Sequence, residues 1–469
     1  MKICLSNLGP IDKAEFSLGD FTVICGENNT GKTYVTYMLY CFLDFWNNEY
    51  RVPIDKSVMD ELFSNGSISL DLQKFITQAN EILKRAAREF SSPQIMARVF
   101  AADRERFEDT NISIELDVSR LKVLQQKNYE VNYSYGIKNK SFINISRNGN
   151  ILDIKLLVDS KEIVDRNMMG FVMPPISNTI KTLVFSSILP QPFISSAERT
   201  GSAIFQKELD FTTSKIVDIL RDREKSKDFH PLDILQTYTS RYPIPVRKNV
   251  DFIRGLSSIE KQKSFICESY PNILKLFGDI IGGSYKTDKR TSTIYYVPKY
   301  NKKLRLTIPE SSSCARSLLD LGYYIRHVAK PNDLLMIDEP EMNLHPESQR
   351  KLARLLAALV NIGIKVYITT HSDYIVKEIS TLIVLNQDVP YIKKIAEQAG
   401  YSKLELLNKE SVKVYTTKYS KTRRDFKPKR CGIYLEENSS SQEEGISVPN
   451  FDETINKISR IQNDIIFGE

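Results

Sequence analysis

The sequence contains little histidine and no cysteine pairing that indicates a metal or disulfide site. Its four histidines, His230, His327, His345 and His371, have no metal-ligand spacing, and the six cysteines form no C-x-x-C pair. A zinc cluster and a disulfide framework are therefore not indicated. The chain also has no D-x-D triplet, so we expect no nuclease activity of its own.

Long apolar runs and a strong charge of one sign are also absent. No stretch approaches the roughly 20 apolar residues that cross a bilayer, and the N-terminal residues enter a strand pattern without a signal-peptide layout. The 65 Lys and Arg and 58 Asp and Glu give a net charge of +7, which is compatible with nucleic-acid contact but does not indicate it. With 41% hydrophobic residues, the chain is expected to be a globular cytoplasmic protein without a membrane partner.

The sequence does contain a complete phosphate-binding loop, G-x-x-x-x-G-K-T, at residues 26–33. It follows an apolar strand pattern and precedes an apolar helical pattern, which is the context that the motif requires. The loop backbone surrounds a β-phosphate, the lysine reaches the β- and γ-phosphates, and the threonine holds Mg²⁺. The predicted ligands are therefore ATP and Mg²⁺. The predicted nucleotide-binding residues are Gly26, Asn28, Asn29, Thr30, Gly31, Lys32 and Thr33, with Lys32 also catalytic and Thr33 also a metal ligand.

Two adjacent carboxylates end a second apolar strand pattern at residues 333–340. Asp338 is placed to bind the Mg²⁺ shell, and Glu339 is placed to accept a proton from the attacking water. The alternative is that the two acids only cap a following helix. The phosphate loop in the same chain favours the ATPase interpretation.

His371 follows a third apolar strand pattern, at residues 364–370. Taken alone it is an ordinary polar residue. Open α/β sheets bind ligands at the carboxyl ends of their strands, so we expect His371 to contact the γ-phosphate or the catalytic carboxylate.

The pattern along the chain predicts several regions. Residues 2–25 suggest short strands, 55–108 helices, 111–158 strands, 205–281 charged helices broken by prolines, and 284–308 strands. We expect four parts. They are an ATPase lobe with the phosphate loop (1–204), a helical arm (205–283), a second ATPase lobe (284–385) and a C-terminal α/β extension (386–469).

Together the phosphate loop, residues 333–346 and Thr370-His371-Ser372 resemble the heads of ABC-type ATPases, in the branch that holds the SMC, Rad50, RecF and OLD proteins. The resemblance implies an α/β fold: a P-loop ATPase head with a mixed β-sheet, flanking helices, an antiparallel β-subdomain and a helical or coiled-coil insertion. It also implies that Asp338 and Glu339 are the Walker B acid and the catalytic base. Residues 343–345 then form the D-loop region, and His371 is the switch histidine.

Such heads also carry a signature motif that contacts ATP held by a second subunit, and here the sequence departs from the family pattern. It has no L-S-G-G-Q, but a serine-rich segment at residues 310–318 precedes a helical pattern at the corresponding place. We expect Ser311, Ser312 and Ser313 to bind phosphate. The alternative is that these serines only cap the helix.

The resemblance implies a homo-oligomer of at least two chains arranged head to tail, each completing the site of the other. ATP then joins the heads and hydrolysis separates them. A Q-loop glutamine is not assigned. The polar segment 195–201 makes Arg199 and Gln206 candidates for site residues.

A strand pair is predicted over residues 412–434, and the basic run between its two strands has two interpretations. It either contacts phosphates of DNA or RNA or forms a solvated hairpin tip, which is the commoner role of a charge run. The run consists of Lys418, Lys421, Arg423, Arg424, Lys427, Lys429 and Arg430.

The resemblance is strongest to the ATPase subunits of bacterial antiphage defence systems such as Septu and PARIS. It implies an oligomeric sensor or scaffold that controls a separate effector, a nuclease or a toxin. The main alternative is a RecF- or Rad50-like ATPase that binds DNA in repair. A transporter subunit is disfavoured by the missing L-S-G-G-Q, and a small-molecule kinase by Glu339, which suits the activation of water.

Overall fold

The computed structural model describes residues 1–121, 129–135, 140–157, 168–204, 242–288, 290–291, 293–419, 433–446, 457 and 459–466. The chain divides into two compact units. The first comprises residues 1–4, 42–92 and 111–191, and the second comprises residues 5–41, 93–110 and 192–469. The described residues of the predicted site all belong to the second unit.

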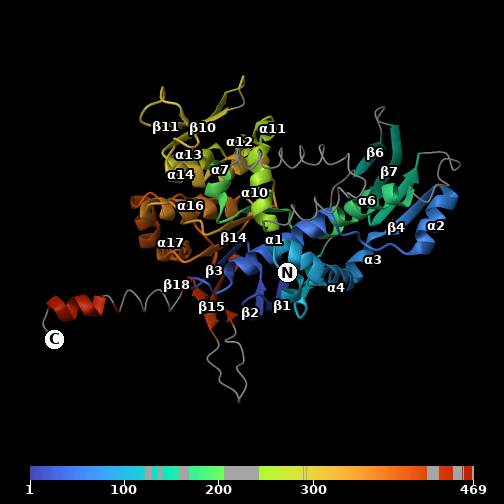
Figure 1. Ribbon diagram of the computed structural model, residues 1–469, viewed down its shortest axis with the longest axis horizontal. Coiled ribbons are helices and arrows are strands. Elements are labelled where there is room, and N and C mark those ends of the chain that lie inside the picture. Colours follow the sequence, from blue (N-terminus) through green and yellow to red (C-terminus); the bar gives the residue numbers. More distant parts are fainter. Residues whose placement is uncertain are drawn as a thin grey trace, which may run out of the picture. The chain divides into compact units, whose positions relative to one another are not determined.

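The second unit contributes seven neighbouring strands to a nine-stranded mixed sheet, in the order β2-β16-β15-β3-β14-β13-β9. Their bounds are β2 Ile11–Ser17, β3 Phe21–Cys25, β9 Pro192–Ser195, β13 Leu334–Asp338, β14 Lys365–Thr370, β15 Val412–Tyr419 and β16 Ile433–Glu437. The run β15-β3-β14-β13-β9 is entirely parallel, whereas β15 pairs with β16 in the antiparallel sense. Although β3 and β15 come from opposite ends of the sequence, they are neighbours (blue and red in Figure 1).

The central strands are apolar because both of their faces are covered. Every residue of β3 and of β13 is buried, which is the pattern expected of parallel strands between helices. Asp338 pairs with Thr369, and Thr370 pairs with Cys25. The parallel strands therefore end together, and the loops that follow them meet at one edge of the sheet.

Helices α13, α16 and α17 pack with this sheet in one hydrophobic core. Helix α16 begins at Pro346, which suits a first helical turn, and His345 Nδ1 accepts the Glu347 N–H at 3.3 Å. The described helices of this unit are α5 Pro93–Phe100, α7 Arg199–Ile204, α10 Ile244–Arg254, α11 Leu256–Ile259, α12 Phe265–Ser269, α13 Pro271–Ile281, α14 Ser313–Ser317, α15 Leu319–Tyr323, α16 Pro346–Asn361, α17 Asp373–Val384 and α18 Pro390–Gln398, with short turns η1 Arg104–Phe107, η4 Tyr324–Val328, η5 Lys403–Glu405 and η6 Lys409–Ser411.

Two small antiparallel sheets complete the second unit. Strands β10, β11 and β12 pair in that order, and β17 pairs with β18. Their bounds are β10 Gly283–Asp288, β11 Thr293–Pro298, β12 Leu306–Thr307, β17 Ser440–Ser441 and β18 Gly445–Ile446.

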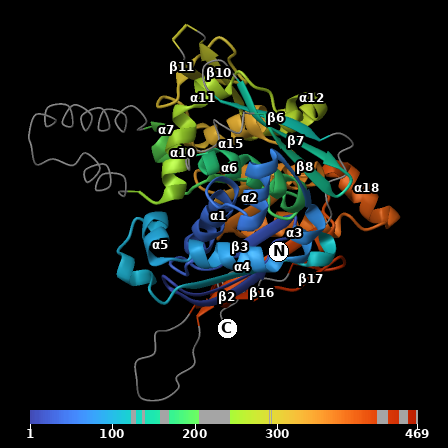
Figure 2. The ribbon, with the colours of Figure 1, turned by 90° about the vertical axis from the view of Figure 1, so that its right-hand side faces the viewer.

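The first unit contains a four-stranded antiparallel sheet in the order β4-β8-β7-β6, of which β6, β7 and β8 are labelled in Figure 2. Its elements are α2 Lys56–Asn65, β4 Ser67–Asp71, α3 Leu72–Thr77, α4 Ala79–Phe90, β5 Asn111–Glu115, η2 Val118–Arg120, β6 Glu130–Tyr135, β7 Lys140–Asn148, β8 Ile151–Leu156, α6 Met168–Ile180 and η3 Lys181–Phe185. Strand β1 (Lys2–Leu8) and helix α1 (Lys32–Asn48) each contribute residues to both units.

The architecture confirms the predicted mixed α/β sheet with flanking helices and an antiparallel β-subdomain. Helices dominate residues 55–108, as the sequence predicts, but the prediction missed the strand β4, which pairs with β8. This strand is only five residues long, so its own sequence shows little periodicity and its pairing with a distant strand decides its conformation.

Part of the predicted helical arm lies outside the described residues, which resume at residue 242. The described remainder forms α10 to α13, and Ile266, Ile273 and Phe277 belong to the main core of the second unit. The four-part division expected from the sequence stays a prediction. None of the described helices combines the length and the apolar character that a bilayer crossing requires.

Candidate functional site

The phosphate loop connects β3 to α1 at the carboxyl edge of the parallel sheet. Gly26 and Gly31 have φ angles of +145° and +81°, and Asn29 has a φ angle of +62°. A side chain at Gly26 would also place its Cβ 2.0 Å from Thr417 Oγ1. Only glycine adopts this conformation and tolerates this approach. Asn28 and Asn29 are exposed at the top of the loop.

Two side chains of the phosphate loop donate hydrogen bonds to its own backbone. Lys32 is 5% exposed and donates to Gly26 O at 2.9 Å and to Glu27 O at 2.8 Å. Thr30 donates to Glu27 O at 2.7 Å and accepts a hydrogen bond from Thr417 at 2.6 Å. The loop therefore keeps its curvature through bonds of its own and one bond from β15.

Asp338 ends β13 and is fully buried. Thr33 Oγ1 donates to Asp338 Oδ2 at 3.2 Å, and Thr369 Oγ1 donates to Asp338 Oδ1. Burial raises the pKa of this carboxyl, and the bonds from Thr369 and Thr33 oppose the rise. The structure thus brings together the two residues predicted to hold Mg²⁺.

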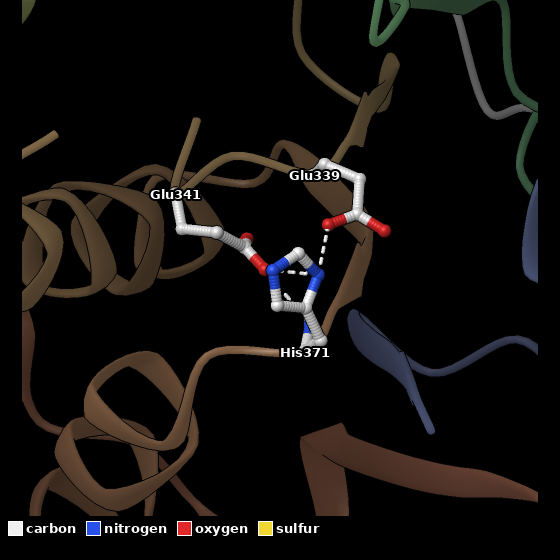
Figure 3. Close-up of side chains that lie close together, drawn as sticks. All are labelled: Glu339, Glu341 and His371. Atoms are coloured by element: carbon white, nitrogen blue, oxygen red, sulfur yellow. Dashed lines mark hydrogen bonds and ion pairs between the residues drawn. The ribbon is translucent and has the colours of Figure 1, made fainter. Parts of the chain in front are cut away.

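Glu339 lies one residue beyond the strand, with a φ angle of +53°. Its Oε1 is 3.9 Å from Lys32 Nζ, and its Oε2 forms an ion pair with His371 Nδ1, as Figure 3 shows. Burial and the charge of Glu341 raise the pKa of Glu339 to about 7, although His371 and Lys32 act in the opposite direction.

Glu341 is a site residue to which the sequence analysis assigned no role. It is 7% exposed, and its Oε1 accepts the His371 N–H at 2.8 Å and lies 3.3 Å from His371 Nδ1. Figure 3 shows the imidazole between the two glutamates. The signal was present in the sequence, since Glu341 is a second glutamate two residues after Glu339, with a proline between them. Ligand atoms of Glu339, Glu341 and His371 lie within 4.8 Å of one another, a set that also suits a metal ion.

The loop after β9 reaches the same edge, because β9 is parallel to β13 and pairs Ser195 with Ile337. Glu198 Oε2 accepts a hydrogen bond from Tyr37 at 3.0 Å, and its negative charge contributes to the raised pKa of Asp338. The candidate Arg199 is 2% exposed and faces the backbone of Asp338 and Glu339. The other candidate, Gln206, lies outside the described residues.

The serine-rich segment forms the N-terminal end of the short helix α14. Ser312 Oγ accepts the Ala315 N–H at 3.2 Å, so this serine does act as the helix cap. Ser311 is 4% exposed and donates to Ile308 O at 2.7 Å. Ser312 and Ser313 are exposed. A phosphate-binding role for the three serines stays a prediction.

Only one residue of the basic run is described. Lys418, in β15, forms an ion pair with Glu436 of β16. The strand pair predicted over 412–434 is present as β15 and β16. The basic residues outside the described part of the chain are Lys421, Arg423, Arg424, Lys427, Lys429 and Arg430.

The donor set fits ATP and Mg²⁺. The sharply curved loop, in which a Cβ at Gly26 would collide with Thr417, has the backbone geometry that phosphate binding requires. Thr33 and Asp338 offer a hydroxyl and a carboxylate, the oxygen ligands that Mg²⁺ prefers. Both the residue types and their arrangement therefore suit the binding of ATP and Mg²⁺.

A family model described as the AAA ATPase domain matches residues 1–376. The chain belongs to this AAA ATPase family. The matched part of the AAA ATPase domain contains the phosphate loop, Asp338, Glu339 and His371, and it ends before β15. A search of curated proteins finds no match.

Solved structures of SMC heads are similar to this AAA ATPase domain. The SMC head bound to the C-winged helix domain of ScpA is 11% identical with a TM-score of 0.34, over 93% of this chain and 97% of that chain. The Smc head with an extended coiled coil from Pyrococcus furiosus, bound to the C-terminal domain of ScpA, is 13% identical with a TM-score of 0.31, over 98% of both chains. The SMC head domain from Thermotoga maritima is 11% identical with a TM-score of 0.31, over 93% of this chain and 98% of that chain.

Proposed function

We propose that this AAA ATPase domain hydrolyses ATP with Mg²⁺. The observation that carries the proposal is the meeting of the phosphate loop, the buried Asp338 and the Glu339–His371 ion pair at one edge of the parallel sheet. These residues lie far apart in the sequence, and a nucleotide triphosphate site needs all of them in one place.

In this proposal each side chain has a distinct task. The loop N–H groups and Lys32 bind the phosphates, and Thr33 and Asp338 hold Mg²⁺, which when bound neutralises charge on the phosphate oxygens. Glu339 accepts a proton from water. A carboxylate with a pKa of about 7 is a better base than an ordinary one and is still largely ionised slightly above neutral pH. His371 holds the Glu339 carboxylate through Nδ1.

The proposed assembly is a head-to-tail homo-oligomer in which the serine-rich segment of one copy faces the phosphate loop of another. The proposed role is that of an oligomeric sensor or scaffold in bacterial antiphage defence, controlling a separate nuclease or toxin. Its support is the sequence resemblance described above. Because function is determined by the site and its partners and not by the fold alone, the role has a test of its own.

The hydrolysis is tested with Glu339→Gln and Lys32→Ala. We expect Glu339→Gln to bind ATP, to lose at least about a hundredfold in kcat because the base is gone, and to form an ATP-dependent dimer in light scattering. Lys32→Ala should lose nucleotide binding. The matched control is Glu397→Gln, an exposed acid on α18, which should hydrolyse ATP at the wild-type rate.

Normal hydrolysis by Glu339→Gln would show that another group is the base. Unchanged ATP affinity in Lys32→Ala would contradict the assignment of the phosphate loop.

The partner is tested by purifying the tagged wild-type protein from cells that carry its native operon, with and without ATP. Recovery of a nuclease or toxin encoded beside it supports the defence role. Recovery of DNA, with ATP hydrolysis that DNA stimulates and salt suppresses steeply, favours the repair alternative instead.

A further inference from the structure

Arg199 is a buried arginine whose hydrogen bonds go to the protein backbone. It begins helix α7 and is 2% exposed. Nε donates to Ser317 O at 2.9 Å, Nη1 to Ser196 O at 3.1 Å and to Asp338 O at 2.7 Å, and Nη2 to Glu339 O at 2.7 Å. Four bonds from one rigid planar group fix four carbonyl groups relative to one another.

Two of those carbonyls belong to the residues that carry the proposed chemistry. Glu339 has a left-handed backbone, a conformation that is unfavourable for a non-glycine residue and persists only where neighbours enforce it. On the amide side, the Glu339 N–H donates to Thr369 O at 3.1 Å. On the carbonyl side, Arg199 supplies the corresponding constraint.

The third carbonyl, of Ser317, ends helix α14, the helix that the serine-rich segment begins. The guanidinium therefore joins this helix directly to the backbone of Glu339. A neighbouring hydrogen bond reinforces the link, since Asn343 Nδ2 donates to Thr200 Oγ1 at 3.3 Å. Thr200, the residue after Arg199, thus contacts the loop that follows β13.

The charge of Arg199 is balanced from a distance. Asp320, on α15, is 2% exposed, and its charge is the largest electrostatic influence that offsets the burial of Arg199. Asp320 also accepts a hydrogen bond from Asn249 at 3.3 Å. The other oxygen of Asp320 accepts the Leu321 N–H at 2.7 Å, so protein groups hold the carboxylate in place while its charge acts on Arg199.

We propose that Arg199 is a positioning residue for the ATPase reaction: it holds Glu339 in its left-handed conformation and couples that conformation to α14. The inference rests on the proposed function, because it assigns Glu339 as the base. The four hydrogen bonds of Arg199 all go to main-chain carbonyl groups, so its role is to position other residues. Movement of α14 on contact with a second subunit is transmitted to the base through this single side chain.

The test is Arg199→Lys, since an ammonium group keeps the charge but cannot span all four carbonyls. We expect kcat to fall at least about tenfold while the affinity for ATP stays within about twofold of wild type, the signature of a displaced catalytic group. Hydrogen exchange should accelerate together at residues 314–318 and 338–341 and remain unchanged in the phosphate loop.

Lys181 provides the matched control. It is also a buried cation that donates to main-chain carbonyls, those of Trp46 and Tyr50 at 2.5 Å, but it belongs to the first unit, whereas the site lies in the second. Lys181→Met should lower Tm and leave kcat unchanged. A loss of Tm without a loss of kcat in Arg199→Lys would therefore overturn the proposal.

A second variant covers the case in which Arg199→Lys does not fold. Asp320→Asn keeps the shape of the side chain and removes the charge that faces Arg199, and it should produce the same kinetic and exchange changes at a smaller size. Wild-type kcat and exchange in Asp320→Asn would then refute the inference. Failure of the wild type to bind ATP would instead defeat the proposed function, and the paired exchange at 314–318 and 338–341 would still test the coupling.

Discussion

Glu339 lies in surroundings that oppose its own negative charge. Its carboxylate is mostly removed from water and close to Glu341, and these two effects raise its pKa to about 7. His371 and Lys32 moderate the rise. Perturbed carboxylates of this kind are characteristic of catalytic bases, because a base works best when its pKa lies near the working pH.

The pH dependence of kcat follows from this environment. The base must be ionised, so the wild-type rate should rise with pH through about 7 and level off above it. Glu341→Gln removes a like charge but keeps an oxygen for the His371 N–H, so the pKa of Glu339 should fall and the rising limb should move down by roughly one pH unit. The measurement is kcat at saturating ATP from pH 5.5 to 8.5.

A matched control is Glu347→Gln, because the Glu347 side chain is exposed and pairs with Arg350 at 3.3 Å. Its pH profile should match that of the wild type. If the rising part of the kcat–pH profile did not move in Glu341→Gln, the ionisation of Glu339 would not be what determines it.

Strand β15 has a second partner that the sequence analysis did not predict. The predicted strand pair is present as β15 and β16, but β15 also pairs with β3 inside the main sheet. The phosphate loop and the acid pair were predictable because each is a contiguous motif with its chemistry in neighbouring residues. The position of β15 was not, since an apolar alternating strand carries no mark of the strand it will join.

The same distinction applies to Arg199. Its polar segment was recognisable as part of a site, but the direction of the side chain depends on the register of β9 against β13. No local sequence pattern indicates whether an arginine side chain contacts a phosphate or a set of carbonyl groups. Glu341 was visible in the sequence, and its role emerged only with its distance of 3.3 Å from His371 Nδ1.

The contact between β15 and the phosphate loop has a measurable effect. Thr417→Val removes the hydrogen bond to Thr30 but keeps the shape, so ATP affinity should fall roughly fivefold, as expected for a bond worth about 1 kcal/mol. The rate at saturating ATP should be nearly unchanged. Titration with a fluorescent ATP analogue gives the affinity.

Thr381→Val is the control, because Thr381 Oγ1 bonds Lys377 O on the surface of α17. Equal affinity in Thr417→Val and wild type would show that β15 does not support the loop.

For the whole molecule, the proposed composite site makes hydrolysis a property of two chains. Ser312 and Ser313 are exposed on α14, where a second copy can reach them. The site on one chain then contains the base and the metal ligands, and the neighbour supplies the remaining phosphate contacts.

Dilution tests this requirement without a substitution. The rate per chain should fall as the protein is diluted below the dissociation constant of the dimer and reach a plateau above it, because two chains must meet for each turnover. The measurement is ATP hydrolysis over a thousandfold range of protein concentration, roughly 10 nM to 10 μM, which brackets typical transient affinities.

As a control, the Glu339→Gln dimer with ATP should resist the same dilution in light scattering. A rate per chain that is constant over the whole range, together with a monomeric mass, would mean that one chain hydrolyses ATP alone.

The bond between Thr417 and Thr30 joins residues 387 positions apart. During synthesis on the ribosome, the phosphate loop emerges early but lacks its neighbouring strand until residue 419 has been made. A prematurely terminated chain therefore carries the loop sequence without the strand that supports it. The loop therefore gains the hydrogen bond from Thr417 only after β15 has been synthesised.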